Sequence, residues 1–84
     1  INELIAIVKN KLEAEIIIQN LKIEDKSFLH KNHKGHQEGK FHLKLTIKSD
    51  ELFKLSKITS TKKIYNILKI ELEEHIHSIQ ILFD

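Results

Sequence analysis

The sequence predicts an α+β two-layer sandwich, in which helices cover one face of a three-stranded sheet. Three observations lead to this prediction. Eighty-four residues are enough for one domain with a modest core, expected to span residues 1–84. Apolar residues recur at helical spacing in two segments, and three other segments have the patterns of strands. The segments follow one another in the order α-β-β-α-β.

Two segments have the periodicity of amphipathic helices. The apolar stripe of residues 1–13 consists of Ile1, Leu4, Ile5, Val8 and Leu12. The stripe of residues 59–74 consists of Ile64, Ile67, Leu68 and Leu72. Thr59 or Ser60 can supply the oxygen that caps the start of this second helix. His75 is expected at its end, where an imidazole interacts well with the helix dipole.

Three segments are predicted to be strands. Residues 15–24 combine a run of β-branched isoleucines with a short alternation. Residues 41–48 alternate apolar and polar side chains most regularly, which indicates one buried and one wet face. Residues 76–83 form the closing strand, and His77 shares its spacing with Ile79 and Ile81, so its side chain is expected on the apolar face. Residues 49–57 are a connection with a short helical turn near 50–54.

Residues 25–40 have no periodicity and contain both glycines and four lysines. His30, His33 and His36 recur here at every third position, a spacing that suits metal binding. The segment is predicted to be a long exposed loop, and a loop of this length in a small domain is usually functional or mobile.

Composition limits the classes of function. Cysteine is absent, so no disulfide and no thiolate ligand can form, which fits a reducing compartment. No apolar run is long enough for a membrane helix and no signal peptide is visible, so a cytoplasmic protein that does not bind membranes is expected. An enzyme is not expected, because the G-x-S-x-G and HExxH patterns are missing and a Ser27–His30 pair has no third member to orient it.

Short motifs occur in a fixed order along the chain. They are Asp25 with Ser27; His30 with His33; His42 with Ser49; Tyr65; and His77-Ser78-Ile79. In this order and spacing the chain resembles the BolA family over nearly its whole length. In that family the long helix carries an R-H-R triplet, which here aligns with Ser60-Thr61-Lys62, so the central histidine is missing.

The resemblance implies that the chain binds a monothiol glutaredoxin as a heterodimer. It further implies a [2Fe–2S] cluster shared with that partner and glutathione, for cluster trafficking or iron-linked regulation. His77 and His30 correspond to the nitrogen ligands, and His33 is a substitute if the loop shifts. His42, on the polar face of its strand, and Tyr65 are expected to contact the partner. Alone, the chain is expected to be a monomer or a weak homodimer.

Two alternatives stay open. The α-β-β-α-β order resembles a type II KH domain, and some BolA-like proteins are described as DNA-binding transcriptional regulators. Phosphate contacts would then come from the lysines around the start of the long helix, which are Lys54, Lys57, Lys62 and Lys63. The GXXG loop of KH domains is absent, however, and a net charge of +2 is small. The other alternative is a zinc site made by His30, His33 and His77.

Overall fold

The computed structural model describes residues 1–27 and 40–84 of the chain. Most of the predicted loop, including His30, His33 and His36, lies outside the described residues. None of the described helices is long and apolar enough to cross a membrane.

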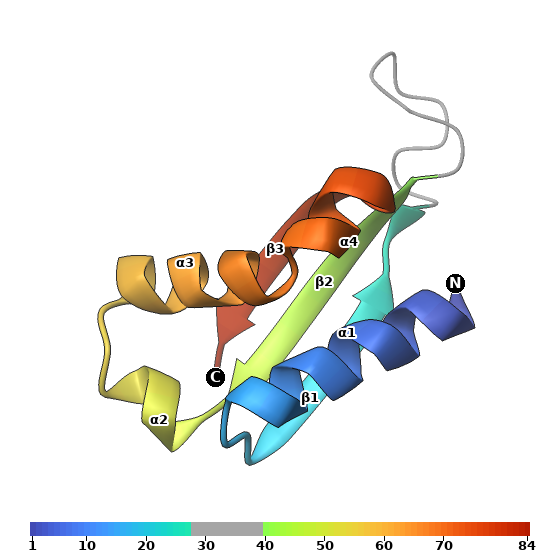
Figure 1. The fold of residues 1–84 in the computed structure, drawn as a ribbon. Helices are drawn as coiled ribbons and strands as arrows, with labels where there is room; N and C mark the ends of the chain where they lie inside the picture. Colours follow the sequence, from blue (N-terminus) through green and yellow to red (C-terminus); the bar gives the residue numbers. More distant parts are fainter. Residues whose placement is uncertain (28–39) are drawn as a thin grey trace.

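One three-stranded sheet forms the back layer of the domain (Figure 1). Its strands are β1 (Asn20–Asp25), β2 (Phe41–Lys48) and β3 (Ile76–Phe83). The central strand, β2, pairs antiparallel with β1 and parallel with β3. A parallel pair needs a crossover connection, and the helices between β2 and β3 provide it.

The helices form the second layer and cover one face of the sheet (Figure 1). They are α1 (Asn2–Glu15), α2 (Asp50–Phe53), α3 (Lys57–Ile67) and α4 (Lys69–Glu74). Short α2 leads from the end of β2 to α3, at the place where a helical turn was predicted. The predicted α+β two-layer fold is therefore confirmed.

The core lies between the helices and β2. Leu43, Leu45 and Ile47 point into it from the central strand, and all three are buried. The helices contribute Leu4, Val8, Leu12, Ile64 and Leu68, which are the central members of the two predicted stripes. Because one buried leucine contributes about 1.5–3 kcal/mol to folding, these few residues dominate the stability of a domain this small.

The prediction of strand over residues 15–19 was wrong. Helix α1 continues to Glu15, and β1 begins only at Asn20. Ile16 is extended (φ −134°, ψ 137°) and buried, whereas Ile17 is exposed. The β-branched run does favour extended backbone. It lacks a ladder partner, because Asn20 already pairs with Lys48, the last residue of β2.

The long helix also departs from its prediction. It begins at Lys57, where the Ser56 hydroxyl accepts a hydrogen bond from the Thr59 amide at 3.1 Å, so neither Thr59 nor Ser60 is the cap. Ser60 is instead buried, and its hydroxyl donates to the Leu52 carbonyl at 3.0 Å, which ties α3 to α2. The helix breaks at Leu68 (φ −98°, ψ 17°), and α4 follows.

Candidate functional site

A β-bulge at the start of β3 determines where His77 lies. Phe41 pairs with Ile76 and His42 pairs with Ser78, so His77 is an extra residue between two paired positions. Ile76 is buried in the core, and His77 is exposed. The expectation that His77 faces the apolar side was therefore wrong, because counting back from Ile79 assumed an uninterrupted strand.

His77 lies against His42, and we call these two residues the histidine pair. Their ring centroids are 4.8 Å apart and the rings are inclined by 56°. Nδ1 of His42 lies 2.7 Å from the Ser78 hydroxyl, which fixes the orientation of the His42 ring. His42 belongs to the polar face of β2, as expected from its alternation with Lys44. Its residue is nevertheless only 6% exposed, so little of its ring is left for a partner to contact.

A second set of hydrogen bonds holds the chain just after the end of β1. The amide and hydroxyl of Ser27 both donate to Oδ1 of Asp25. This is a turn in which an aspartate side chain accepts a hydrogen bond from the backbone amide two residues later. The His42 amide in turn donates to the Ser27 hydroxyl at 3.0 Å. The Asp25-x-Ser27 motif therefore anchors the end of β1 beside the histidine pair.

Charged side chains surround the histidine pair on the outer face of the sheet. Lys26 and Lys44 line a hollow of about 360 Å³ together with His42 and Gln80. Desolvation tends to raise the pKa of nearby Glu24, but a hydrogen bond from Lys26 and the charges of Lys22, Lys26 and Lys44 outweigh it and leave that pKa below its ordinary value. The surface beside the histidine pair is therefore polar and mainly cationic.

The described residues contain no cluster able to hold a metal by themselves. Within residues 1–27 and 40–84, no group of three or more His, Asp or Glu side chains comes together at a possible metal site. His77 offers one exposed imidazole, and imidazole nitrogen is a good ligand for iron or zinc. The predicted loop ligands His30 and His33 lie outside the described residues, so the structure does not place them relative to His77. His75 lies at the end of α4, as expected, 3.8 Å from a Glu74 carboxylate oxygen.

The other predicted site residues lie elsewhere, on α2 and α3. Tyr65 is partly exposed on the outer side of α3. Lys54, Lys57 and Lys62 are exposed, whereas Lys63 forms an ion pair with Glu51 at 3.3 Å. Sequence reasoning missed the contact of Ser78 with His42, because that contact depends on the register between two strands.

Comparison with known proteins gives a consistent result. The family model described as BolA-like protein matches residues 12–83. The BolA domain of SufE1 from Arabidopsis thaliana is 31% identical, with a TM-score of 0.76, and the match covers 92% of this chain and 85% of that chain. BolA1 from the same plant is 26% identical, with a TM-score of 0.79, and 94% of this chain and 87% of that one are covered.

More distant structures share the fold. BolA1 from Mus musculus is 19% identical, with a TM-score of 0.75, over 94% of this chain and 62% of that chain. No curated protein matches the sequence. The family match over most of the chain and the related structures lead to one conclusion: this chain belongs to the BolA-like family.

Proposed function

We propose that this chain binds a monothiol glutaredoxin and contributes His77 as a nitrogen ligand to a [2Fe–2S] cluster shared by the two proteins. The observation that carries the proposal is the exposed imidazole of His77, which the bulge of β3 turns away from the core. Such a ring is accessible to a ligand held by a second protein.

The donor chemistry of the chain fits a shared cluster. The chain has no cysteine, and the described residues bring no three metal-ligating side chains together, so His77 needs ligands from outside them. Histidine replaces thiolate on one iron of Rieske centres, so nitrogen ligation of such a cluster has a precedent. Sulfur ligands would come from the glutaredoxin and glutathione, and His30 or His33 would supply a second nitrogen. The cluster is then cargo for trafficking or a signal in iron-linked regulation.

The neighbours of His77 would keep its ring in place before the partner arrives. The His42 ring packs against it, and Ser78 holds the His42 ring at Nδ1. Asp25 and Ser27 fix the chain where it enters the segment that contains His30 and His33. Ordering these groups in advance lowers the entropy cost of forming the complex.

The test is anaerobic co-purification with a monothiol glutaredoxin and glutathione, read by visible absorption and circular dichroism. We expect a heterodimer whose cluster spectrum differs from that of the glutaredoxin homodimer and is lost in His77→Ala. His75→Ala is the matched control, because His75 is an exposed histidine two residues away. A spectrum that is indifferent to His77, or the absence of a heterodimer, would contradict the proposal.

A further inference from the structure

Large apolar side chains are exposed around α3, and we call them the α3 surface. They are Phe53, Leu55, Ile58 and Tyr65. Phe53 is 86% exposed and Ile58 is 70% exposed, so both lie almost fully in solvent. Single exposed apolar residues are ordinary, but a contiguous group on a small domain marks an interaction site.

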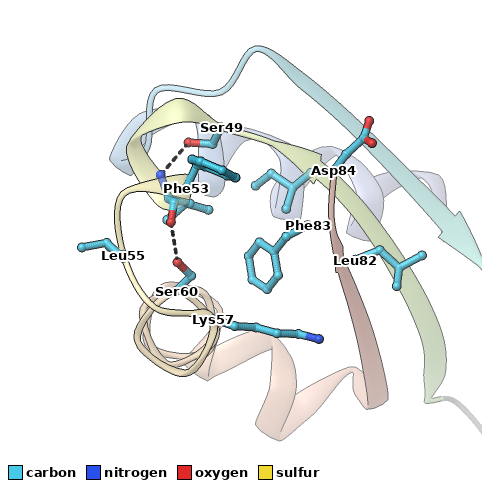
Figure 2. Close-up of a pocket in the computed structure, with 10 residues that line it drawn as sticks. Ser49, Phe53, Leu55, Lys57, Ser60, Leu82, Phe83 and Asp84 are labelled. Carbon is cyan, nitrogen blue, oxygen red and sulfur yellow. Dashed lines mark hydrogen bonds between the residues drawn. The ribbon is translucent and has the colours of Figure 1, made fainter.

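A hollow of about 320 Å³ lies at one end of the α3 surface (Figure 2). Phe53 and Leu55 border it on the α2 side, and Phe83 borders it on the side of β3, whereas the Leu82 side chain points away from it. The Lys57 side chain extends along its edge. An apolar cavity of about 150 Å³ holds a benzene ring, so this hollow has room for one leucine or phenylalanine side chain.

A second, shallower hollow of about 680 Å³ follows the outer side of α3. Ile58 and Tyr65 form its apolar floor, and they lie two helical turns apart on one stripe. Lys57 lines both hollows, so the two form one continuous surface. The second hollow is a shallow depression on the face of α3, since all its lining residues lie between positions 57 and 69; we call this depression, together with the deeper recess at its end, the groove.

The charge on this groove has one sign along α3. The sequence of α3 contains three charged residues, all lysines. Three lysines line the second hollow, Lys57, Lys62 and Lys69, and no carboxylate does so among the described residues. Two carboxylates lie outside it: Glu51 pairs with Lys63, and Asp84 borders the first hollow. A partner with acidic side chains beside its apolar ones would complement this surface.

We propose that the α3 surface docks an acidic amphipathic helix of a partner protein. A large apolar residue of that helix fills the hollow beside Phe83, and the rest of its apolar face covers Ile58 and Tyr65. Its carboxylates lie opposite Lys57, Lys62 and Lys69. This is the helix-in-groove mode of recognition. It goes beyond the proposed cluster ligation, because it uses α3 and not the bulge of β3.

The apolar floor favours a protein over a nucleic acid as the occupant. Lysines alone would suit phosphates equally well. A phosphate backbone, however, offers no aliphatic groups to cover Ile58 and Phe53, whereas an amphipathic helix buries both and gains about 25 cal/mol per Å² of apolar area.

The first test titrates the full ¹⁵N-labelled chain with a synthetic helical peptide that carries leucines on one face and glutamates beside them. Two control peptides have the same length: one has the same residues scrambled to remove the apolar face, and one has lysine at every glutamate. We expect amide shifts confined to residues 52–70 and 82–84, with binding that weakens as salt rises. A 12-nucleotide oligothymidine tests the nucleic-acid alternative.

The second test uses exposed residues, so that the fold is retained. Ile58→Ser and Lys62→Glu are each expected to weaken the acidic peptide about tenfold. The matched controls Ile7→Ser and Lys9→Glu change exposed residues of α1 and should leave the affinity unchanged. The proposal is overturned if the scrambled peptide binds as well as the amphipathic one, if the controls weaken binding equally, or if oligothymidine binds more tightly. These readouts need no cluster or glutaredoxin, so they fail independently of the proposed function.

Discussion

At the start of β3, a bulge places His77 against His42, and His42 forms hydrogen bonds with Ser78 and Ser27. The α3 surface instead presents apolar side chains and lysines with few such bonds. At the histidine pair, a few nitrogen and oxygen atoms are held in fixed orientations. The α3 surface instead offers exposed apolar area and the positive charge of its lysines. Metal ligation depends on direction, and helix docking depends on area, so one small domain carries surfaces suited to two kinds of partner.

The largest predicted effect is a loss of stability, and it comes from the centre of β2, the strand on which both regions are built. Leu45 is fully buried between the helices and the two outer strands. Leu45→Ala should lower the free energy of unfolding by about 2–5 kcal/mol, because it removes buried methyl groups and leaves a cavity. Urea unfolding monitored by circular dichroism measures this loss. A change below about 0.5 kcal/mol, the range of ordinary surface substitutions, would contradict the tight packing of Leu45 in the core.

Two ion pairs differ in how deeply they are buried, so they should differ in their contribution to stability. Lys11 of α1 binds the buried Glu71 of α4 at 2.7 Å, whereas Lys63 and Glu51 form a more exposed pair at 3.3 Å between α3 and α2. Lys11→Ala should cost about 1–3 kcal/mol, because it leaves a buried carboxylate without its cation. Lys63→Ala should cost less than about 1 kcal/mol. Equal losses in urea unfolding would contradict this ranking.

A substitution of Ser60 tests whether the α3 surface depends on the buried hydrogen bond between α3 and α2. Its buried hydroxyl donates to the Leu52 carbonyl, so Ser60→Ala leaves that carbonyl without this donor and should cost about 1 kcal/mol. The position of α2 against α3 should loosen, and the affinity for the acidic peptide should fall. The cluster spectrum with glutaredoxin should not change. A peptide affinity equal to that of the wild type would show that the groove does not depend on this bond.

Ser78→Ala is the reciprocal experiment at the histidine pair. Its effect on stability should be within about 1 kcal/mol, because the bond is partly buried and serves one ring. We expect the ¹⁵N shifts of the His42 imidazole to change as the ring loses its fixed orientation, while peptide binding at the α3 surface stays as in the wild type. Unchanged imidazole shifts would show that Ser78 does not orient His42.

The smallest predicted effect concerns Glu24, on the outer face of the sheet. The surrounding lysines hold its pKa below the ordinary value in the folded state, so its contribution to stability is present above the unfolded pKa and is lost as the pH falls through the folded pKa. Glu24→Gln should therefore lower the urea midpoint slightly at pH 7 and not at about pH 3, below the ordinary pKa of glutamate. An equal difference at both values would exclude this charge effect.

The sequence predicted best where side chains obey one period. Alternation in residues 41–48 identified β2 and its buried face, and helical spacing identified the core residues of α1 and α3. It predicted least where a single residue interrupts the period. One extra residue at His77 turned that side chain to the other side of the sheet, and Leu68 divided one helix into two. The hydrogen bond of His42 with Ser78 joins residues that are 36 positions apart, which no local pattern encodes.

The parallel pairing of β2 with β3 also has a consequence for how the molecule folds. His42 meets Ser78 only after the intervening helices have packed and the loop between the two strands has closed, and contacts at such sequence separation form slowly. The antiparallel pairing of β1 with β2 can form without the contacts between β2 and β3, and so can the individual helices. In a refolding experiment the contact between the two imidazole rings should therefore appear last, together with the completed sheet, so a chain that presents the histidine pair is one that has finished folding.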